Sequence, residues 1–244
     1  DLPLPSPKHP HHFRLGQHFE ALLNTWLADS AAFQLRAANL QVQDGKRTVG
    51  EFDFLVDHDG ETEHWEAAVK FYLGTGDTRE LANWYGPNTE DRFDIKYNRL
   101  ISRQLQLASD PHAEALLNVR NIHVHRSRCF MKGRLFYPRA QWMGHAVQPP
   151  MVANPTHERG WWLAEGDFLP AFEDTGHRFV YLPKQLWLSP LLADDIAAPL
   201  SAWEIQELIE SPQAEQAIHV AEVTDAGEIS RGFIVKNQWI ETVT

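Results

Sequence analysis

Four charged residues in one short stretch have the types and spacing of a site for a divalent cation. They are Glu51, Asp53, Glu66 and Lys70. Side chains two positions apart share a face of a β-strand, so Glu51 lies beside Asp53 on one predicted strand. By the same rule, Glu66 and Lys70 share a face of the next strand. Because buried carboxylates need a compensating charge, the stretch predicts oxygen ligands for a hard cation beside an ammonium group. The alternative is an ordinary solvated face.

Two central β-strands are predicted to position these residues. Apolar residues alternate along Thr48–Val56 and along Glu63–Tyr72, and the polar bend Asp57–Gly60 lies between the two runs. This pattern predicts an antiparallel hairpin with a short loop. Phe52 and Phe54 are expected to share the opposite face of the first strand, so both faces of the hairpin are predicted to be covered.

The remaining elements of the first half follow from apolar periodicity and from turn residues. A helix is predicted over residues 14–29, a strand over Phe33–Val42, and a second helix over Thr89–Ala108 after the hairpin. Further strands are predicted over Leu117–His125 and Cys129–Tyr137. The order helix, three strands, helix and strand predicts an α/β (α+β) fold, a mixed sheet flanked by helices.

The second predicted helix carries a row of cations. Arg92, Lys96, Arg99 and Arg103 recur at positions i, i+4, i+7 and i+11, which places them on one helix face. Residues 91–140 contain 10 basic and 4 acidic side chains, although the whole chain has a net charge of -11. The charge of the whole chain argues against non-specific binding of nucleic acid, but a local basic patch is what contacts with phosphates require. A solvated helix face is the alternative.

The hairpin also resembles the core of the PD-(D/E)XK nucleases, in which a G-x-x-D strand precedes an (E/D)-x-K strand. The resemblance is carried by the sequence GEFD at residues 50–53 and EAAVK at residues 66–70. More narrowly, nearly the whole chain resembles a proteobacterial family designated domain of unknown function 1853. That resemblance rests on HWEAAVKFYL in the hairpin, KGRLFYP at Lys132–Pro138 and RGFIV at Arg231–Val235.

The nuclease resemblance implies roles for five residues. Asp53 corresponds to the central metal ligand, Glu66 to the second ligand, and Glu20 or Glu51 to a supporting ligand or base for the attacking water. Lys70 corresponds to the residue that orients the nucleophile or stabilises the charge of the transition state. The implied cofactor is Mg²⁺, or Mn²⁺ in an assay, because all the ligands are hard oxygens.

One position departs from the nuclease pattern. Ala68 stands two residues before Lys70, where the E-x-K form has its acid. Either Glu66 has taken over that role or the site is inactive. The sequence therefore leaves two functions open. One is a metal-dependent nuclease that hydrolyses DNA or RNA, with a restriction-endonuclease-like fold. The other is an inactive nuclease-like scaffold that binds protein or nucleic acid.

Composition sets the broad class of protein. The 244 residues are 43% hydrophobic and 23% charged, which is typical of an ordinary globular chain. The single cysteine, Cys129, excludes an internal disulfide and a Cys-based zinc site. No apolar run approaches the ~20 residues needed to cross a bilayer, and the first residues lack the apolar core of a signal peptide. A cytoplasmic protein without a membrane partner is therefore expected.

Three segments are predicted along the chain. Residues 1–13 are rich in Pro and His and are expected to be a mobile lead-in, and residues 14–139 form the nuclease-like core. Residues 140–244 form an acidic, β-rich C-terminal extension, in which a capping box at Ser201–Glu204 and a hairpin ending near Val235 are predicted. The acidic extension is a candidate surface for a protein partner.

Overall fold

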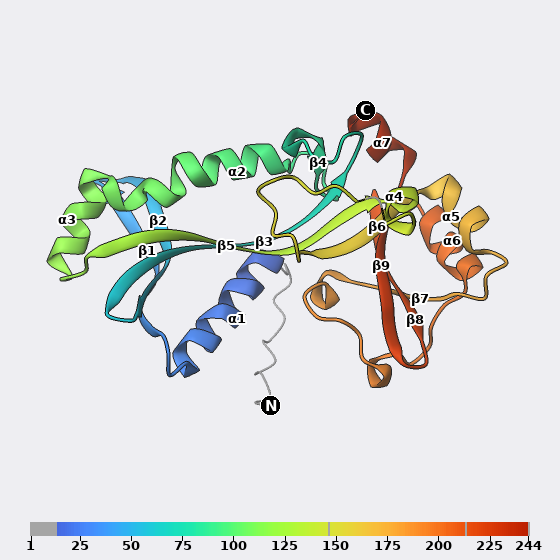
Figure 1. Ribbon diagram of the computed structural model, residues 1–244, viewed down its shortest axis with the longest axis horizontal. Helices are drawn as coiled ribbons and strands as arrows, with labels where there is room; N and C mark the ends of the chain where they lie inside the picture. The colour runs from blue at the N-terminus through green and yellow to red at the C-terminus, as the bar shows by residue number, and fades with distance from the viewer. Residues whose placement is uncertain (1–13, 146, 213, 244) are drawn as a thin grey trace. The chain divides into compact units, whose positions relative to one another are not determined.

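The structure is a computed structural model that describes residues 14–145, 147–212 and 214–243 (Figure 1). The predicted lead-in at residues 1–13 lies outside the described residues. The contacts within the chain divide it into two compact units. Unit 1 contains residues 14–69 and 107–130, and unit 2 contains residues 70–106 and 131–243. This division differs from the predicted boundary after residue 139, because each unit draws on two separate segments of the chain.

The described residues contain nine strands and seven α-helices. The strands are β1 Gln34–Asp44, β2 Arg47–His58, β3 Glu61–Gly74, β4 Trp84–Tyr85, β5 Val124–Pro138, β6 Glu158–Ala164, β7 Arg178–Tyr181, β8 Ala217–Thr224 and β9 Gly227–Val235. The helices are α1 Leu15–Asp29, α2 Phe93–Ser102, α3 Pro111–Val119, α4 Arg139–Met143, α5 Glu165–Phe172, α6 Ala202–Glu210 and α7 Asn237–Val243.

Hydrogen bonds connect the strands of a mixed sheet in the order β1-β2-β3-β5-β6-β9-β8-β7, and β4 pairs with β3. The pairs β5–β6 and β6–β9 are parallel. The pairs β1–β2, β2–β3, β7–β8 and β8–β9 are antiparallel. The prediction of a mixed α/β fold with helices beside the sheet is therefore confirmed.

In unit 1, the predicted hairpin is confirmed as β2 and β3. Its strands pair from His58↔Glu61 to Phe54↔Trp65. The turn residues Asp59 and Gly60 have φ values of +51° and +80°. Two successive positive φ values are typical of a type I′ turn, whose twist matches that of the flanking strands. The Asp-Gly pair therefore sets the register of the strands that carry the candidate site.

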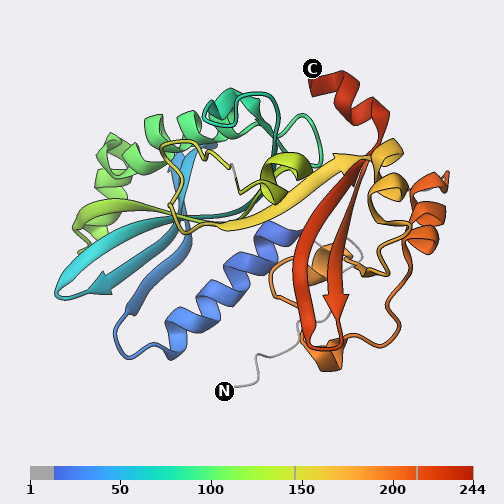
Figure 2. The same ribbon diagram turned by 45° about the vertical axis from the view of Figure 1, so that its right-hand side comes forward.

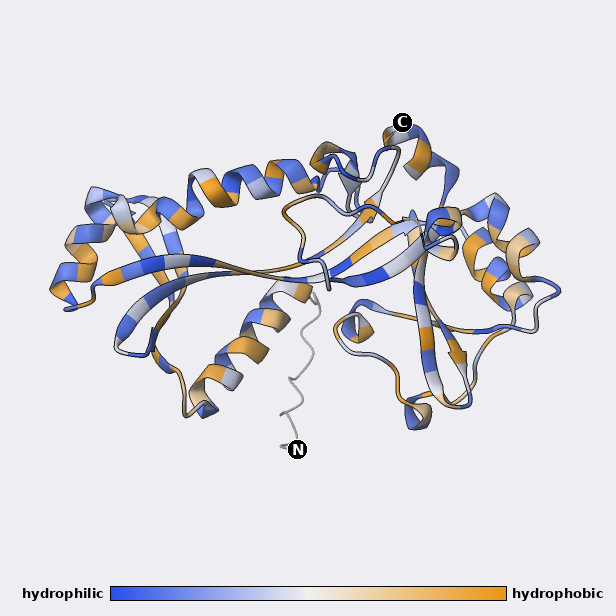
Figure 3. Ribbon diagram, viewed as in Figure 1, coloured by the Kyte–Doolittle hydropathy of each residue, from blue (hydrophilic) through white to orange (hydrophobic). Residues whose placement is uncertain are grey.

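The two faces of this hairpin are covered by different helices. α1 packs Leu23 and Leu27 against Phe54 and Trp65 on one face, as its amphipathic pattern in Figure 3 indicates. α3 packs against the other face, and the two helices lie on opposite sides of the strands in Figure 1. The prediction that Phe52 shares a face with Phe54 is wrong. Phe52 belongs to the core cluster that contains Ala113 and Leu117 of α3, whereas Phe54 belongs to the cluster under α1.

The strand predicted over Leu117–His125 is also wrong in its first half. Residues Pro111–Val119 form α3, and β5 begins only at Val124. Asp110 caps this helix, because its side chain accepts a hydrogen bond of 2.8 Å from the backbone N–H of His112, and Pro111 occupies the first helical turn. An Asp-Pro pair is a helix start signal, and it overrides the strand-like run of apolar residues that follows.

In unit 2, helices α5 and α6 pack on the β8–β9 hairpin (Figure 2). The predicted capping box is confirmed, since Ser201 accepts a hydrogen bond from the Glu204 backbone and the Glu204 carboxylate accepts one from the Ser201 backbone. The predicted C-terminal hairpin is confirmed as β8 and β9. Besides its strands, this C-terminal part contains the helices α5, α6 and α7.

Arg231 is a buried cation of unit 2 with several hydrogen-bond partners. Its side chain is 1% exposed and forms a two-pronged ion pair with Glu228, in which Nη2 lies 2.8 Å from Oε2. The same guanidinium donates to the backbone carbonyls of Leu186, Trp187 and Ser189. One buried cation therefore ties β9 to the loop that follows β7.

His219 lies next to this network in an aromatic environment. Its ring stacks on Phe233 at a centroid distance of 4.3 Å and meets the edge of Trp187 at 4.9 Å. The ring is 1% exposed, and neither ring nitrogen has a hydrogen-bond partner among the described residues. Burial, with the nearby positive charge of Arg231, holds the pKa of His219 well below its usual value of 6.5. The folded chain therefore keeps this histidine neutral.

We expect the His219→Leu variant to lose less stability than the wild type when the solution becomes acidic. Below about pH 6.5 the unfolded chain binds a proton at this histidine that the folded chain refuses, so the wild-type free energy of unfolding falls as pH falls. Protonation of the histidine stabilises the unfolded chain by about 1.4 kcal/mol per pH unit, which amounts to roughly 2 kcal/mol between pH 6.5 and pH 5. Urea unfolding at pH 7 and pH 5 measures this loss, which the leucine variant should not show.

The control is His145→Asn, because His145 is exposed and its positive φ of +52° suits asparagine. This variant should keep the wild-type dependence on pH. If His219→Leu and His145→Asn lose equal stability between pH 7 and pH 5, the assignment of the acid sensitivity to His219 is wrong.

Candidate functional site

Asp53 lies where the strands β2 and β3 stop pairing. The register of the pair ends at Phe54↔Trp65, and beyond it the Asp53 Oδ2 atom accepts a hydrogen bond of 2.8 Å from the backbone N–H of Ala67. The carboxylate thus bonds a strand N–H group that would otherwise need another partner. This bond fixes one carboxylate oxygen of Asp53 on β3.

The charge environment of Asp53 is strongly acidic. Burial is the largest cause that raises the pKa of Asp53, and the charge of Glu66 is the next. The hydrogen bond from Ala67 opposes them, while Glu20 and Glu51 raise the pKa further, so that it reaches about 7. The pKa of Glu20 is raised as well, first by burial and then by Glu51 and Glu66. Asp53 and Glu20 therefore each interact electrostatically with the other carboxylates that the sequence singled out.

Glu66 is the most enclosed of these carboxylates. It is 2% exposed, and its Oε2 atom lies 3.6 Å from Nε2 of His64, which is also fully buried. The other ring nitrogen of His64 lies 3.2 Å from the Ser127 hydroxyl, and the ring meets Phe52 edge-on at 4.8 Å. Glu66 thus lies inside the protein beside an imidazole that the sequence-based interpretation did not connect with it.

The chemistry of these carboxylates suits a hard divalent cation, because Mg²⁺ and Mn²⁺ prefer oxygen ligands. The arrangement of these carboxylates fits a metal ion less well than their chemistry does. Among residues 14–145, 147–212 and 214–243, no three His, Cys, Asp or Glu side chains are grouped closely enough to hold a metal ion. The donor types therefore fit the implied cation, whereas a finished coordination sphere is not formed.

A different acid on β3 has a structural role. Glu63 is 1% exposed and is held by Arg126 Nε at 2.8 Å, Arg128 Nε at 2.6 Å and the Trp65 indole at 2.7 Å. Burial alone would raise the pKa of Glu63, but the hydrogen bonds and charges of these partners lower it. Two arginines of the predicted basic segment are therefore engaged by a buried carboxylate, which reduces the charge available for phosphate contacts.

Lys70 belongs to unit 2. Its ammonium group pairs with Asp91 Oδ2 at 2.5 Å, and the other oxygen of Asp91 accepts a hydrogen bond of 3.0 Å from the Tyr72 hydroxyl. The sequence did not indicate Asp91, because the two residues lie 21 positions apart and are joined only by the fold. The role of Lys70 in catalysis stays a prediction.

The predicted row of four cations on one long helix is wrong in extent. α2 ends at Ser102, and residues Gln104–Ser109 form a 3-10 helix, so Arg92 and Arg103 only flank α2. The Ser102 hydroxyl donates to the Asn98 carbonyl at 2.7 Å, a bond that weakens a helix end. Arg92 is also paired with Asp94 at 2.7 Å. Lys96 and Arg99 therefore remain as the cations within the helix, and Lys96 donates to Gln104 at 3.1 Å.

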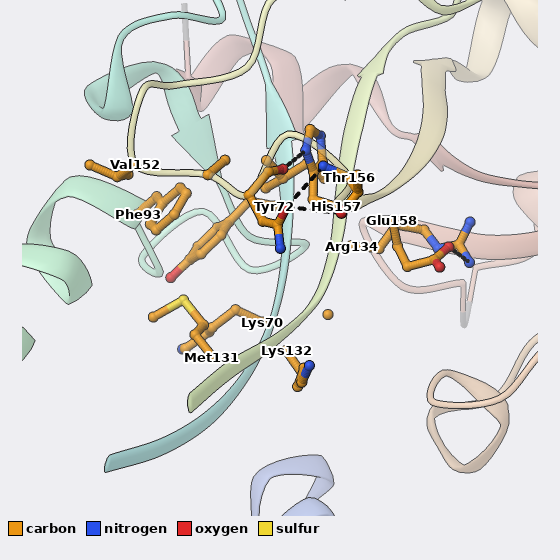
Figure 4. A pocket seen from close by; sticks show the side chains of 14 residues that line it. Lys70, Tyr72, Phe93, Met131, Lys132, Arg134, Val152, Thr156, His157 and Glu158 are labelled. Carbon is orange, nitrogen blue, oxygen red and sulfur yellow. Dashed lines mark hydrogen bonds and ion pairs between the residues drawn. The ribbon is translucent and has the colours of Figure 1, made fainter. Parts of the chain in front are cut away.

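Sequence reasoning missed a cavity of about 390 Å³ in unit 2 (Figure 4). Its lining comes from Lys70, Tyr72, Phe93, the segment Met131–Leu135, and residues 152–154 and 156–158. The KGRLFYP segment is predicted from sequence as part of a strand and of the basic segment, but its mixture of basic and apolar residues does not by itself indicate a cavity.

Comparison with known proteins gives one match. A family model described as Domain of unknown function (DUF1853) matches residues 5–235. The chain belongs to this family. No curated protein and no solved structure matches the chain. The DUF1853 match includes the carboxylates of unit 1 and the cavity of unit 2, so both candidate sites lie within the family region.

Within the part of this DUF1853 chain that the structure describes, no helix is both long enough and apolar enough to span a membrane.

Proposed function

We propose that this chain is a metal-dependent phosphodiester hydrolase with a restriction-endonuclease-like, PD-(D/E)XK-type site in which Asp53 and Glu66 hold Mg²⁺ or Mn²⁺. The observation that carries the proposal is the environment of Asp53, where burial and three neighbouring carboxylates raise the pKa to about 7. Neighbouring carboxyl groups whose ionised forms destabilise one another are typical of functional sites. The hairpin order and the GEFD and EAAVK segments support the same function.

The chain's own residues divide the work in this proposal. A bound cation would lower the pKa of a water molecule and offset charge on the scissile phosphate. Asp53 and Glu66 would hold the cation, and Glu20 or Glu51 would accept the proton of the attacking water. A raised pKa makes the Glu20 carboxylate a stronger base than an ordinary glutamate. For the residues of unit 2, the nuclease resemblance alone implies that Lys70 stabilises negative charge, and Lys96 and Arg99 are candidates for contacts with a nucleic-acid backbone. The reducing cytoplasm suits the single cysteine.

The proposal predicts that Mn²⁺ binds more tightly as the pH rises. A cation competes with the proton on Asp53, and a carboxyl with a pKa of about 7 is roughly 10% ionised at pH 6 and roughly 90% ionised at pH 8. Calorimetric titration with Mn²⁺ should therefore show about a tenfold gain in affinity between these two pH values. Asp53→Asn should abolish binding at both, since it keeps the side-chain shape but removes the charge.

The matched control is Asp59→Asn, which removes the same charge from the same hairpin. Asp59 is exposed, and its φ of +51° in the turn suits asparagine. This variant should bind Mn²⁺ as the wild type does and should cleave a phosphodiester substrate at the wild-type rate. Equal binding by wild type and Asp53→Asn would overturn the proposed cation site.

A second candidate is a nuclease-like chain that has lost hydrolysis and binds protein or nucleic acid. Ala68 in place of the usual acid favours it, and so does the enclosure of Glu66 beside His64. The two candidates separate in the same titration. A scaffold would give no Mn²⁺-dependent heat and no cleavage, whereas a hydrolase would give both.

A further inference from the structure

The cavity of unit 2 contains none of the carboxylates that are proposed to hold a cation. Its walls come from the end of β3, the start of α2, the middle of β5 and residues 152–158. Its volume is about 390 Å³, near the lower end of the range of roughly 300–1,000 Å³ that small-molecule sites occupy. The cavity therefore suits a ligand the size of one nucleotide and excludes a much larger cofactor.

Two stacked aromatic rings lie behind one wall of the cavity. The rings of Tyr72 and Phe93 stack at a centroid distance of 4.8 Å with an interplanar angle of 10°. Burial, and then the charge of Asp91, raises the pKa of Tyr72, so the phenol stays neutral. Met131 and Leu135 extend the apolar lining. Tyr72 is 1% exposed and Phe93 is 6% exposed, so a ligand would meet the edges of these rings, and edge contacts with aromatic rings favour a planar ring in the ligand.

The rest of the lining is cationic. Lys70, Lys132 and Arg134 contribute three positive charges, and Arg134 pairs with Glu158 at 3.1 Å. Even when Asp91, the partner of Lys70, is counted with Glu158, the cavity keeps a positive excess in a chain with a net charge of -11. Figure 4 shows Arg134 and Glu158 on the side opposite Phe93. A phosphate group is the anion that such a set of lysine and arginine side chains recognises.

The segment that closes the cavity is fixed by its own hydrogen bonds. Asn154 accepts bonds of 2.9 Å from both the backbone and the hydroxyl of Thr156. His157 Nδ1 lies 2.6 Å from the Asn154 carbonyl, so it carries the proton, and Nε2 accepts from the Tyr137 hydroxyl at 2.8 Å. Burial lowers the pKa of His157 and keeps the ring neutral. A lining ordered in this way loses little entropy when a ligand binds.

We propose that this cavity binds a nucleoside monophosphate, with the base against Tyr72 and Phe93 and the phosphate among Lys70, Lys132 and Arg134. The shared chemistry is a phosphate monoester on a nucleoside, whether free or at the end of a strand. The site goes beyond the proposed hydrolase, because it needs no divalent cation and can exist in a chain without nuclease activity.

Calorimetry of the full chain in EDTA tests the proposal, with AMP, adenosine, inorganic phosphate, and an oligodeoxynucleotide with and without a 5′-phosphate as probes. AMP should bind at least about tenfold more tightly than adenosine or phosphate alone. A phosphorylated oligonucleotide that binds more tightly than AMP assigns the site to strand ends, and the reverse order assigns it to free nucleotides. Because EDTA removes divalent cations, failure of the proposed hydrolase leaves this result unaffected.

Two variants make the test specific. Lys132→Gln, at an exposed residue of the lining, should lower the affinity for AMP at least about fivefold. Lys184→Gln removes the same charge elsewhere in unit 2 and should change this affinity less than about twofold. Phe93→Leu should weaken AMP but not phosphate. The proposal is overturned if AMP gives no heat at millimolar concentration, if both lysine variants weaken it equally, or if the oligonucleotide binds equally without its phosphate.

Discussion

Arg231→Met is expected to lower the free energy of unfolding of unit 2 by about 3–5 kcal/mol. The guanidinium is the counter-ion of Glu228, whose side chain is 6% exposed, and it satisfies three backbone carbonyls of the loop after β7. Methionine fills much of the same volume but leaves a carboxylate buried without its cation. The destabilisation therefore comes from the unpaired charge and from the carbonyls that lose a donor.

Urea unfolding followed by far-UV circular dichroism measures this loss. The double variant Arg231→Met with Glu228→Gln should recover part of the loss, because it removes the stranded charge as well. Arg231→Lys should fall between wild type and Arg231→Met, since an ammonium group keeps the charge but cannot form the two-pronged pair. A double variant as unstable as Arg231→Met would show that the pair with Glu228 does not cause the effect.

Gly133→Ala is expected to destabilise the chain by more than about 3 kcal/mol. Gly133 has a φ of +129°, and a Cβ atom there would lie 1.7 Å from the carbonyl oxygen of Lys70. No side chain fits in that space, so the backbones of β3 and β5 would have to separate. This separation would also deform the cavity that both segments line.

Thermal unfolding by calorimetry or circular dichroism measures the effect, and Gly166→Ala is the control in the same unit. A Cβ atom at Gly166 meets no atom within 4 Å, and the residue lies in α5, where alanine is the better helix former. That variant should be neutral or stabilised by up to about 1 kcal/mol. Equal melting temperatures for wild type and Gly133→Ala would contradict the close approach of the two backbones.

The sequence predicts well those elements that are determined by residues close together in the chain. α1 matches residues 14–29 closely because its apolar stripe and the sharp change after the lead-in mark both ends. The β2–β3 hairpin was predictable because alternation and the Asp-Gly turn agree. α3 was missed because a cap made by Asp110 and Pro111 competes with a run of apolar residues that also suits a strand. The long basic helix was overextended because periodicity alone does not mark where a helix ends.

Some features of the candidate site could likewise be predicted from the sequence, and others could not. The types and spacing of Glu51, Asp53 and Glu66 could be read from strand periodicity, because all three lie on adjacent strands. The enclosure of Glu66 by His64 and the bond from Ala67 to Asp53 could not, since both depend on where β2 and β3 part. The cavity of unit 2 was beyond prediction for a similar reason, because its lining comes from four separate segments of the chain.

The interleaving of the two units limits how this protein can be dissected. Residues 70–106 of unit 2 are inserted into unit 1, and β3 and β5 each pass from one unit into the other. A truncation after residue 139 keeps every described segment of unit 1 but removes most of unit 2, and the complementary fragment lacks the strand segments that begin the cavity. Unit 2 is therefore complete in neither half of a chain cleaved after residue 139, so crystallisation of this unit needs the intact polypeptide.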